Sequence, residues 1–128
     1  MRLLLDTNVF LWLQTEPERV GAHRALVEDP RTELILSAAS SWEIAIKYSL
    51  RKLPLPSSPE RYVPEHMRAI GAVGLPVEHA HALRIAQLPA LHRDPFDRLL
   101  IAQALELELT ILTGDPAVAQ YPAQTLLP

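Results

Sequence analysis

The sequence predicts an α/β fold with a mostly parallel central sheet. Short apolar runs such as Leu3–Leu5 alternate along the chain with longer segments of helical periodicity. Strands that are separated by helices pair in parallel through right-handed crossovers. The length of 128 residues and the apolar content of 48% suit a single domain, over residues 1–128, with one core.

The first part of the chain is predicted to contain a strand followed by helices. Leu3–Asp6 reads as a short buried strand, because three leucines precede the aspartate. A helix is expected over Asn8–Gln14, with Thr7 or Asn8 as its N-cap. A second helix is expected over Glu18–Glu28, and it ends where an Asp-Pro step disfavours helical geometry.

The middle of the chain continues the alternation. Glu33–Leu36 is predicted to be a strand, and Ser40–Leu53 a long helix. Leu53–Pro59 is rich in proline and serine, which interrupts regular structure. The next helix is expected over Arg61–Ala72, with Pro64 in its first turn, where a proline is tolerated.

The last part of the chain is predicted to complete the sheet. Val73–Val77 contains a proline and is expected to be a short edge strand. Helices are expected over His79–Leu88 and Pro95–Leu107, because both segments are rich in alanine and leucine. Thr110–Thr113 reads as a strand, and Gln124–Leu127 as a final one.

The composition excludes several classes of protein. Without cysteine, the chain has no disulfides, zinc–thiolate sites or thiol nucleophiles, which fits a reducing cytoplasm. No apolar stretch approaches the ~20 residues of a membrane span, and the N-terminal run is too short for a signal peptide. A net charge of −3 argues against nucleic-acid binding by bulk positive charge, but it permits a nuclease that attracts phosphate locally.

Carboxylates lie at the edges of the most apolar segments, at Asp6, Glu43, Asp97 and Asp115. An isolated ion near the interior is costly to desolvate, and acids brought together repel one another unless a cation lies among them. In a parallel sheet, ligands bind beyond the carboxyl ends of the strands, where Asp6 and Asp115 fall. The pattern therefore predicts a divalent-metal site.

Asp6 and Glu43 each have a simpler explanation than metal binding. Asp6 can end the first strand and favour the next helix through the helix dipole. As a metal ligand, it would have Thr7 and Asn8 as polar support. Glu43 can form an i,i+4 ion pair with Lys47 on an exposed face. The apolar neighbours of Glu43 favour partial burial, and both roles can coexist.

The segment from His92 to Arg98 places polar groups just before a predicted helix. Asp94 followed by Pro95 is typical of an N-cap and a first helical residue, so capping is the main role expected of Asp94. Asp97 can complete a capping box, but the apolar face that follows favours a metal ligand. The i,i+3 spacing of the two acids allows Asp94 to support Asp97 at the metal.

Asp115 is the acid that helix capping explains best, because it precedes Pro116 and a short helical turn. Gly114 gives the backbone room to turn or to approach a ligand. Thr113 can add a hydroxyl group to the site. The sequence alone leaves capping and metal binding open for Asp115.

The histidines and aromatic residues carry weaker signals. The five histidines form no ligand pattern, and His92, in a loop near the expected site, is interpreted as incidental. Trp42 shares one helical stripe with Ile46 and Leu50. Trp42 and Phe96 are therefore expected to pack in the core rather than to stack on nucleic-acid bases.

Four segments resemble, in order, the motifs of PIN-domain nucleases, and especially of the VapC-type toxin ribonucleases of toxin–antitoxin pairs. They are Leu3–Asn8, Ser41–Lys47, Asp94–Ala104 and Leu112–Asp115. The resemblance implies a three-layer α/β/α sandwich and a homodimer. It implies Mg²⁺ or Mn²⁺ held by Asp6, Glu43, Asp97 and Asp115. It also implies a cognate VapB-type antitoxin, for which an apolar groove between the early helices is the expected docking surface.

The expected function is metal-dependent hydrolysis of RNA by the toxin of a type II toxin–antitoxin system. Carboxylate oxygens suit Mg²⁺ or Mn²⁺, and a bound ion activates water without any protein nucleophile. One alternative is a catalytically silent RNA- or protein-binding module on the same fold. A phosphatase with Asp6 as nucleophile would need a second aspartate where Asn8 stands. Groups expected to support the ligands or contact RNA are Asp94, Thr7, Asn8, Thr113, Lys47, Arg98, Arg51, Lys52 and Arg93.

Overall fold

The computed structural model describes residues 1–128 and contains one five-stranded sheet in the order β3-β2-β1-β4-β5. All neighbouring strands pair in parallel, which confirms the predicted sheet. The strands are β1 (Arg2–Leu5), β2 (Glu33–Ser37), β3 (Val73–Leu75), β4 (Thr110–Leu112) and β5 (Thr125–Leu126). The short strand β3 lies at one edge of the sheet, as its proline-marked sequence predicts.

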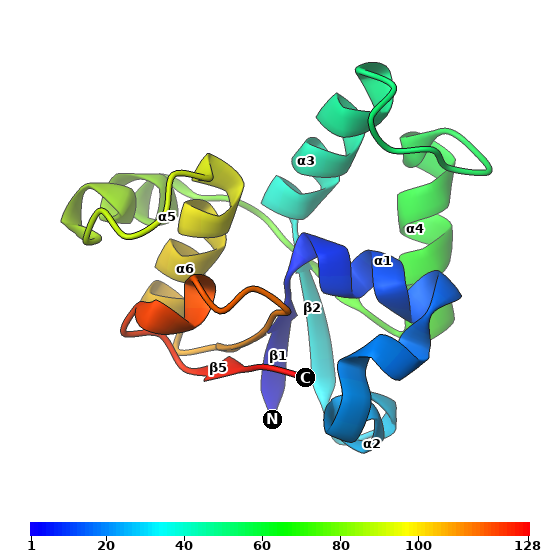
Figure 1. The fold of residues 1–128 in the computed structure, drawn as a ribbon, viewed down its shortest axis with the longest axis horizontal. Helices are drawn as coiled ribbons and strands as arrows, with labels where there is room; N and C mark the ends of the chain where they lie inside the picture. Colours follow the sequence, from blue (N-terminus) through cyan, green and yellow to red (C-terminus); the bar gives the residue numbers. More distant parts are fainter.

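Helices cover both faces of the sheet, so the fold is a three-layer α/β/α sandwich (Figure 1). In that view, α5 and α6 lie on one side of the sheet, and α1 and α4 lie on the other. The α-helices are α1 (Thr7–Thr15), α2 (Arg24–Glu28), α3 (Ala38–Ser49), α4 (Pro59–Ile70), α5 (His79–Arg84) and α6 (Pro95–Leu107). Short 3₁₀ segments are η1 (Pro17–His23), η2 (Ile85–Gln87) and η3 (Val118–Gln120). None of the helices is long and apolar enough to cross a membrane.

The leucine run of β1 is apolar throughout because both faces of this central strand are covered. Leu4 packs into the core on the α6 side, together with Ile101 and Ile111. Leu3 and Leu5 point to the opposite face, where they join the core that contains Phe10 of α1. A strand that lies between two helical layers has no polar face, so its sequence cannot alternate.

One predicted helix is kinked in the structure, and another ends early. The segment Glu18–Glu28 is not one α-helix but contains most of η1 and then α2, and the chain kinks inside η1 at Gly21, whose φ of 57° and ψ of −129° lie outside the helical region. The helix predicted over Ser40–Leu53 begins at Ala38 and ends at Ser49. Arg51, two residues beyond that end, has a left-handed φ of 58°. The pattern of apolar side chains predicts neither the kink at Gly21 nor the end of α3 at Ser49.

Other helix boundaries also differ from the predictions. The helix predicted over His79–Leu88 is α-helical only to Arg84, after which the chain tightens into η2. Helix α4 begins at Pro59, so Pro64 lies inside the helix rather than in its first turn. Pro59 follows an extended Ser58 and occupies the first helical turn, where the missing N–H of proline costs nothing.

Candidate metal centre

The candidate site lies at the carboxyl edge of the central strands. Asp6 directly follows β1, and Asp115 lies three residues after the end of β4. These strands are hydrogen-bonded neighbours, with Leu5 paired to Leu112. Glu43 is on α3, which begins directly after β2 on the other side of β1. The order of the strands therefore brings acids from distant parts of the chain to one edge.

Helix caps fix the two helices that carry the remaining acids. Ser37 Oγ accepts a hydrogen bond of 3.0 Å from the amide of Ala39, which caps α3. Asp94 Oδ1 accepts bonds of 2.8 Å from the Phe96 amide and 3.3 Å from the Asp97 amide. The predicted capping role of Asp94 is confirmed, and it orients the first turn of α6, which contains Asp97.

Each of three buried acids has one carboxylate oxygen held by a side-chain donor. Thr113 donates to Oδ2 of Asp6 at 2.5 Å. Lys47 donates to Oε2 of Glu43, so the expected ion pair exists, although Glu43 itself is only 4% exposed. His92 Nε2 lies 2.8 Å from Oδ2 of Asp97. These contacts fix the orientation of carboxylates that come from three separate elements.

The second oxygen of each of these carboxylates accepts no hydrogen bond from any side chain. In Glu43, Oε1 is fully buried and has no hydrogen-bond partner at all. A buried carboxylate oxygen without a donor is destabilising unless a cation approaches it. Carboxylate oxygens are the donors that hard divalent ions prefer. The donor chemistry of the acids therefore suits a divalent metal ion. The three side chains whose ligand atoms lie within 4.8 Å of one another are His92, Asp97 and Asp115, and Asp6 and Glu43 are not part of that group.

The acids disfavour one another's ionisation when no cation balances them. Burial, followed by the charges of Asp6 and Asp94, raises the pKa of Asp97 to about 7. Burial also raises the pKa of Asp6, and the charge of Glu43 adds to this effect against the opposing Thr113 hydrogen bond. Such mutual influence is expected of acids that lie close together where burial removes them from water.

Asp115 is tied to the same site through His92. His92 Nε2 lies 3.3 Å from Oδ2 of Asp115, and the ligand atoms of His92, Asp97 and Asp115 all lie within 4.8 Å of one another. Oδ1 of Asp115 accepts a bond of 2.9 Å from the Ala117 amide, which closes a turn before η3. The N-cap of η3 is Ala117, without a side-chain cap bond, so the predicted helix-capping role of Asp115 is not observed. Both oxygens of Asp115 thus have protein partners, and its side chain is 40% exposed.

The model of the PIN domain family matches residues 3–124 of this chain. The chain belongs to the PIN domain family. Two proteins of Mycobacterium tuberculosis are similar to it in sequence. Ribonuclease VapC16 is 52% identical over 64 residues, which cover 50% of this chain and 45% of VapC16, less than half of that relative's length. Ribonuclease VapC22 is 28% identical over 116 residues, which cover 88% of this chain and 86% of VapC22.

Solved structures share the fold of this PIN domain. VapBC2 from Rickettsia felis, bound to a promoter DNA fragment, has a TM-score of 0.76 at 12% identity over 99% of this chain and 98% of that chain. DNA-bound VapBC from Salmonella typhimurium has a TM-score of 0.66 at 18% identity over 98% and 97% of the two chains. At these identities, the likeness concerns the α/β sandwich alone.

The interpretation of His92 as an incidental loop residue is wrong for this PIN domain. The loop that leads into α6 folds back so that the imidazole contacts both Asp97 and Asp115. The sequence offers one signal for this contact, which is the position of His92 two residues before the N-cap Asp94. Because only Arg93 separates His92 from the N-cap Asp94, His92 stays close to the first turn of α6.

Of the residues predicted to support the metal ligands in this PIN domain, some lie beside the acids and others make contacts elsewhere. Thr113 contacts Asp6, and Asn8 lines a cavity beside Asp6. Thr7 donates instead to Ser40 Oγ at 2.8 Å, which connects α1 to α3. The prediction that Thr7 or Asn8 caps α1 is wrong, because Asp6 occupies the N-cap position and α1 starts at Thr7.

Arg98 does not contact any of the acids, contrary to its predicted place beside the site. Its guanidinium donates to the carbonyl groups of Pro89 and Ile85 and to the Tyr121 hydroxyl, at 3.0–3.2 Å. Successive helical residues differ by about 100° in direction, so the neighbour of Asp97 faces another side of α6. Arg98 therefore holds the loop before α6 in place.

The prediction that Trp42 packs in the core is also wrong. Trp42 is 58% exposed, although its helix buries Ile44, because Trp42 lies on the edge of the buried face of α3. It meets Phe96 edge to face, with ring centroids 5.0 Å apart. Because Trp42 adjoins Glu43 and Phe96 adjoins Asp97, this aromatic pair joins α3 to α6 beside the acids.

A cavity of about 270 Å³ opens beside Asp6 and is bounded by α1 and the loop after β4. Gly114 forms part of its wall, where a Cβ atom would lie 2.3 Å from Cη2 of Trp12. The missing side chain of Gly114 therefore makes room for the indole ring of Trp12. Arg19 stacks on the same ring, 4.0 Å from its centroid, and this contact helps to hold Trp12 in place.

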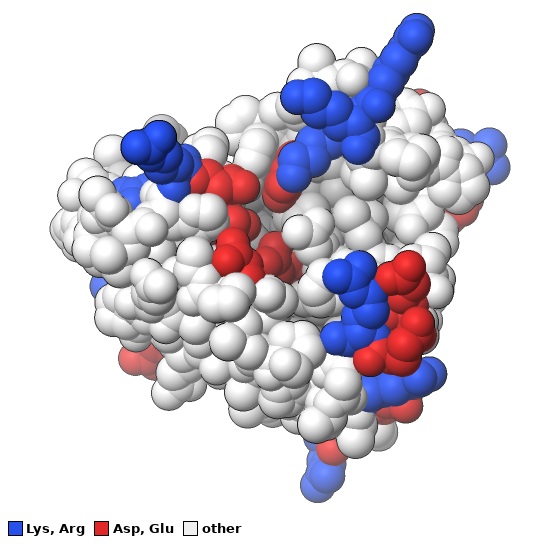
Figure 2. Space-filling view, in the orientation of Figure 1, with Lys and Arg blue, Asp and Glu red and all other residues white.

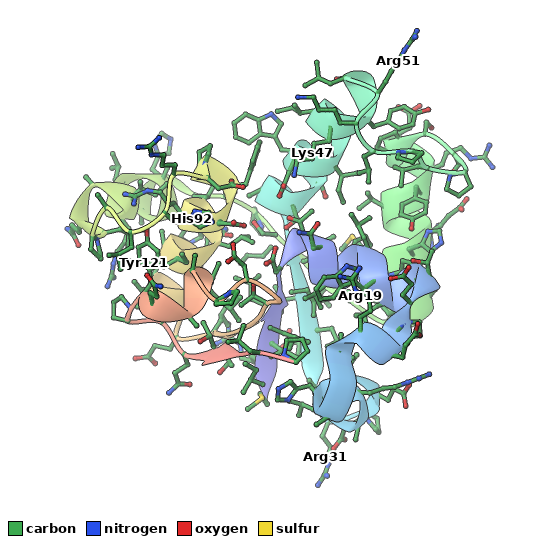
Figure 3. All side chains as sticks on the ribbon, in the orientation of Figure 1. Arg19, Arg31, Lys47, Arg51, His92 and Tyr121 are labelled. Atoms are coloured by element: carbon green, nitrogen blue, oxygen red, sulfur yellow. The ribbon has the colours of Figure 1, made fainter.

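The acids of the PIN domain lie in a hollow that basic side chains border. Figure 2 shows carboxylates gathered in a depression of this face, with Lys and Arg side chains above it and beside it. In the same orientation, Lys47 on α3 and His92 near α6 lie on either side of the hollow (Figure 3). The face therefore combines an acidic centre with a partly basic rim.

Proposed function

We propose that this PIN domain, over residues 1–128, is a metal-dependent endoribonuclease and the toxin of a type II toxin–antitoxin system. The observation that carries the proposal is the arrangement of Asp6, Glu43 and Asp97. Each has one oxygen held by a side chain and one oxygen without a side-chain donor. The names of the similar ribonucleases VapC16 and VapC22 support RNA as the substrate. A cytoplasmic location is part of the same proposal.

Asp6, Glu43 and Asp97 would hold Mg²⁺ or Mn²⁺ in this proposal, and Asp115 would lie next to the ion. Oxygen donors alone favour these ions over softer metals. When bound, the ion would supply positive charge to the phosphodiester and to the attacking water. The rigid support of Thr113 and Lys47 keeps the carboxylates in place, so that little reorganisation accompanies binding.

The chain's own residues would then bind and orient the RNA. Lys47 remains partly exposed beside Glu43, so its ammonium can pair with a phosphate oxygen of the substrate. Arg51, Lys52 and Arg93 are exposed and are candidates for contacts to flanking phosphates. Because no cysteine is available and no serine–histidine pair lies at the acids, water is the attacking group.

A metal-withdrawal experiment tests the proposed function. The purified chain is expected to cleave a structured RNA in the presence of Mg²⁺ or Mn²⁺, and to lose this activity when a chelator is added. Restoring either ion should restore cleavage at the same RNA positions. RNA binding without cleavage under all these conditions would contradict the proposal and would favour a catalytically silent binding module.

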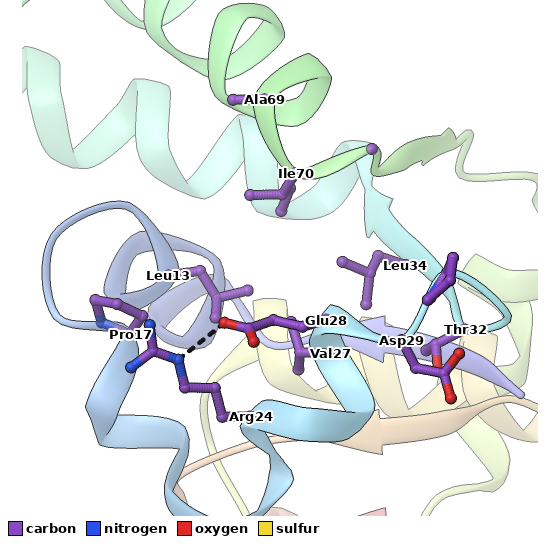
Figure 4. A pocket seen from close by; sticks show the side chains of 12 residues that line it. Leu13, Pro17, Arg24, Val27, Glu28, Asp29, Thr32, Leu34, Ala69 and Ile70 are labelled. Atoms are coloured by element: carbon purple, nitrogen blue, oxygen red, sulfur yellow. Dashed lines mark hydrogen bonds and ion pairs between the residues drawn. The ribbon is translucent and has the colours of Figure 1, made fainter.

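A groove on the opposite side of α1 supports a protein partner. It has a volume of about 410 Å³ and is lined by Leu13 of α1, Val27 of α2 and Ile70 of α4 (Figure 4). Arg24 and Glu28 form an ion pair of 2.9 Å at the same groove. A groove that combines apolar side chains with polar and charged ones suits an amphipathic helix, so we propose it as the docking site of a VapB-type antitoxin.

The Val27→Asp variant tests this docking site. It should weaken binding to a VapB-type antitoxin by at least about tenfold, because burying an unpaired carboxylate in an interface is costly. Val77→Asp, at an exposed position outside the groove, is the matched control. Equal binding by both variants in titration calorimetry would contradict the assignment.

Light scattering of the free chain, 14.3 kDa as a monomer, tests the proposed homodimer.

A further inference from the structure

We propose that His92 is a positioning residue, which orients Asp97 through a hydrogen bond from its Nε2–H group and keeps Asp115 nearby through an electrostatic contact to the same nitrogen. This inference rests on the proposed metal-dependent function and adds a residue to it. The observation that carries it is the pair of contacts from His92 Nε2, at 2.8 Å to Asp97 Oδ2 and 3.3 Å to Asp115 Oδ2.

The other ring nitrogen of His92 identifies the tautomer. The backbone amide of Arg93 donates a hydrogen bond of 3.1 Å to Nδ1. An amide N–H requires an acceptor, so Nδ1 carries a lone pair and the ring proton lies on Nε2. The Nε2–H group therefore donates to Asp97 Oδ2 at 2.8 Å, a distance typical of a hydrogen bond. Asp115 Oδ2 lies 3.3 Å from the same nitrogen, which is an electrostatic contact rather than a second hydrogen bond.

His92 adds a polar contact between α6 and the loop after β4, two segments that already pack together in the core. Asp97 lies in the first turn of α6, whereas Asp115 lies in the loop after β4. Asp115 is also fixed by the Ala117 amide at Oδ1, so His92 ties Asp97 to a carboxylate that is already oriented. With Oδ2 occupied, Asp97 presents Oδ1 as the oxygen that remains for a cation.

A direct metal-ligand role for His92 conflicts with this geometry. To bind an ion, Nε2 must lose its proton, and the neutral ring must then carry a proton on Nδ1. That N–H would face the N–H of Arg93 at the 3.1 Å that separates the two nitrogens. The loop would have to move for the repulsion to be relieved. Donation to the ligands, rather than ligation, is the role that the observed backbone permits.

The experiment is a Mn²⁺ titration of the full chain and three histidine variants, monitored by the EPR signal of free Mn²⁺. His92→Ala is expected to weaken Mn²⁺ binding by about 10- to 100-fold, the range typical of residues that orient metal ligands. His92→Gln keeps an N–H donor near the position of Nε2 and should recover most of the affinity. His79→Ala, at an exposed histidine away from the acids, should bind as the wild type does.

Several outcomes would overturn the positioning role. It fails if His92→Ala binds Mn²⁺ as tightly as the wild type, or if His92→Gln is as weak as His92→Ala. Pulsed EPR of bound Mn²⁺ provides an independent test, since a directly bonded nitrogen that disappears in His92→Ala would show ligation instead. If the wild type binds no Mn²⁺, the proposed function itself fails and takes this inference with it. If the wild type and His92→Ala bind Mn²⁺ with the same high affinity, only the positioning role is contradicted, and the proposed function is not.

Discussion

Replacing Asp6 by asparagine should lower the rate of RNA cleavage by more than about 100-fold, which exceeds the range for residues that only support a metal ligand. Asparagine keeps the shape of the side chain and can still accept the Thr113 hydrogen bond through its carbonyl oxygen. The variant loses the negative charge, and an NH2 group that cannot bind a cation replaces the oxygen Oδ1 that faces the proposed ion. The measurement is single-turnover cleavage of an RNA at saturating Mg²⁺, with Asp6→Asn beside the wild type.

The matched control for this variant is Asp29→Asn. Asp29 pairs with Arg31 at 2.9 Å in the turn before β2, at the opposite end of the strands from the acids. Its loss should leave cleavage near the wild-type rate. A fully active Asp6→Asn protein would remove the basis of the proposed mechanism, whereas equal losses in both variants would indicate a general effect of folding.

Asp97→Asn is expected to stabilise the metal-free protein at pH 8 while it abolishes cleavage. The folded-state pKa of Asp97 is raised from 3.8 to about 7, so the folded chain holds a proton that the unfolded chain releases. Stability therefore falls as the pH rises from about 4 to about 7. With 1.36 kcal/mol for each pH unit, the wild type should lose up to about 4 kcal/mol over this interval.

Urea unfolding at pH 5 and pH 8 in the presence of a chelator checks this expectation. The difference in unfolding free energy between wild type and Asp97→Asn should grow in favour of the variant as the pH rises. Glu18→Gln, at an exposed acid of η1 without an ion pair, should follow the wild type at both pH values. Equal unfolding free energies for the wild type and Asp97→Asn at pH 8 would show that ionising Asp97 does not destabilise the fold, which contradicts the prediction. Mg²⁺ should stabilise the wild type and not the variant.

The sheet and the acids at its edge follow from local features of the sequence. The leucine run before Asp6 can only be a strand covered on both faces, and the Asp94-Pro95 step marks the start of α6. Acids that end or follow such elements must gather where parallel strands end. The order of the strands then explains why residues as distant as Asp6 and Thr113 meet.

The features that the sequence did not predict depend on tertiary contacts. His92 reaches the acids because its loop is held by Arg98, whose own donors face that loop rather than the site. The exposure of Trp42 depends on how α3 meets α6, which the helical period alone does not determine. The break at Gly21 requires one left-handed residue, and glycine in a helical stretch only permits it.

The hydrogen bond from Thr113 to Asp6 joins residues separated by 107 positions in the chain. During synthesis, Thr113 is added 107 residues after Asp6. A ribosome-bound chain that lacks β4 has neither this bond nor the strand that places Asp115 beside Asp97. If the chain is the nuclease proposed above, its site would stay incomplete until β4 is translated, which would protect the messenger RNA from the nascent chain.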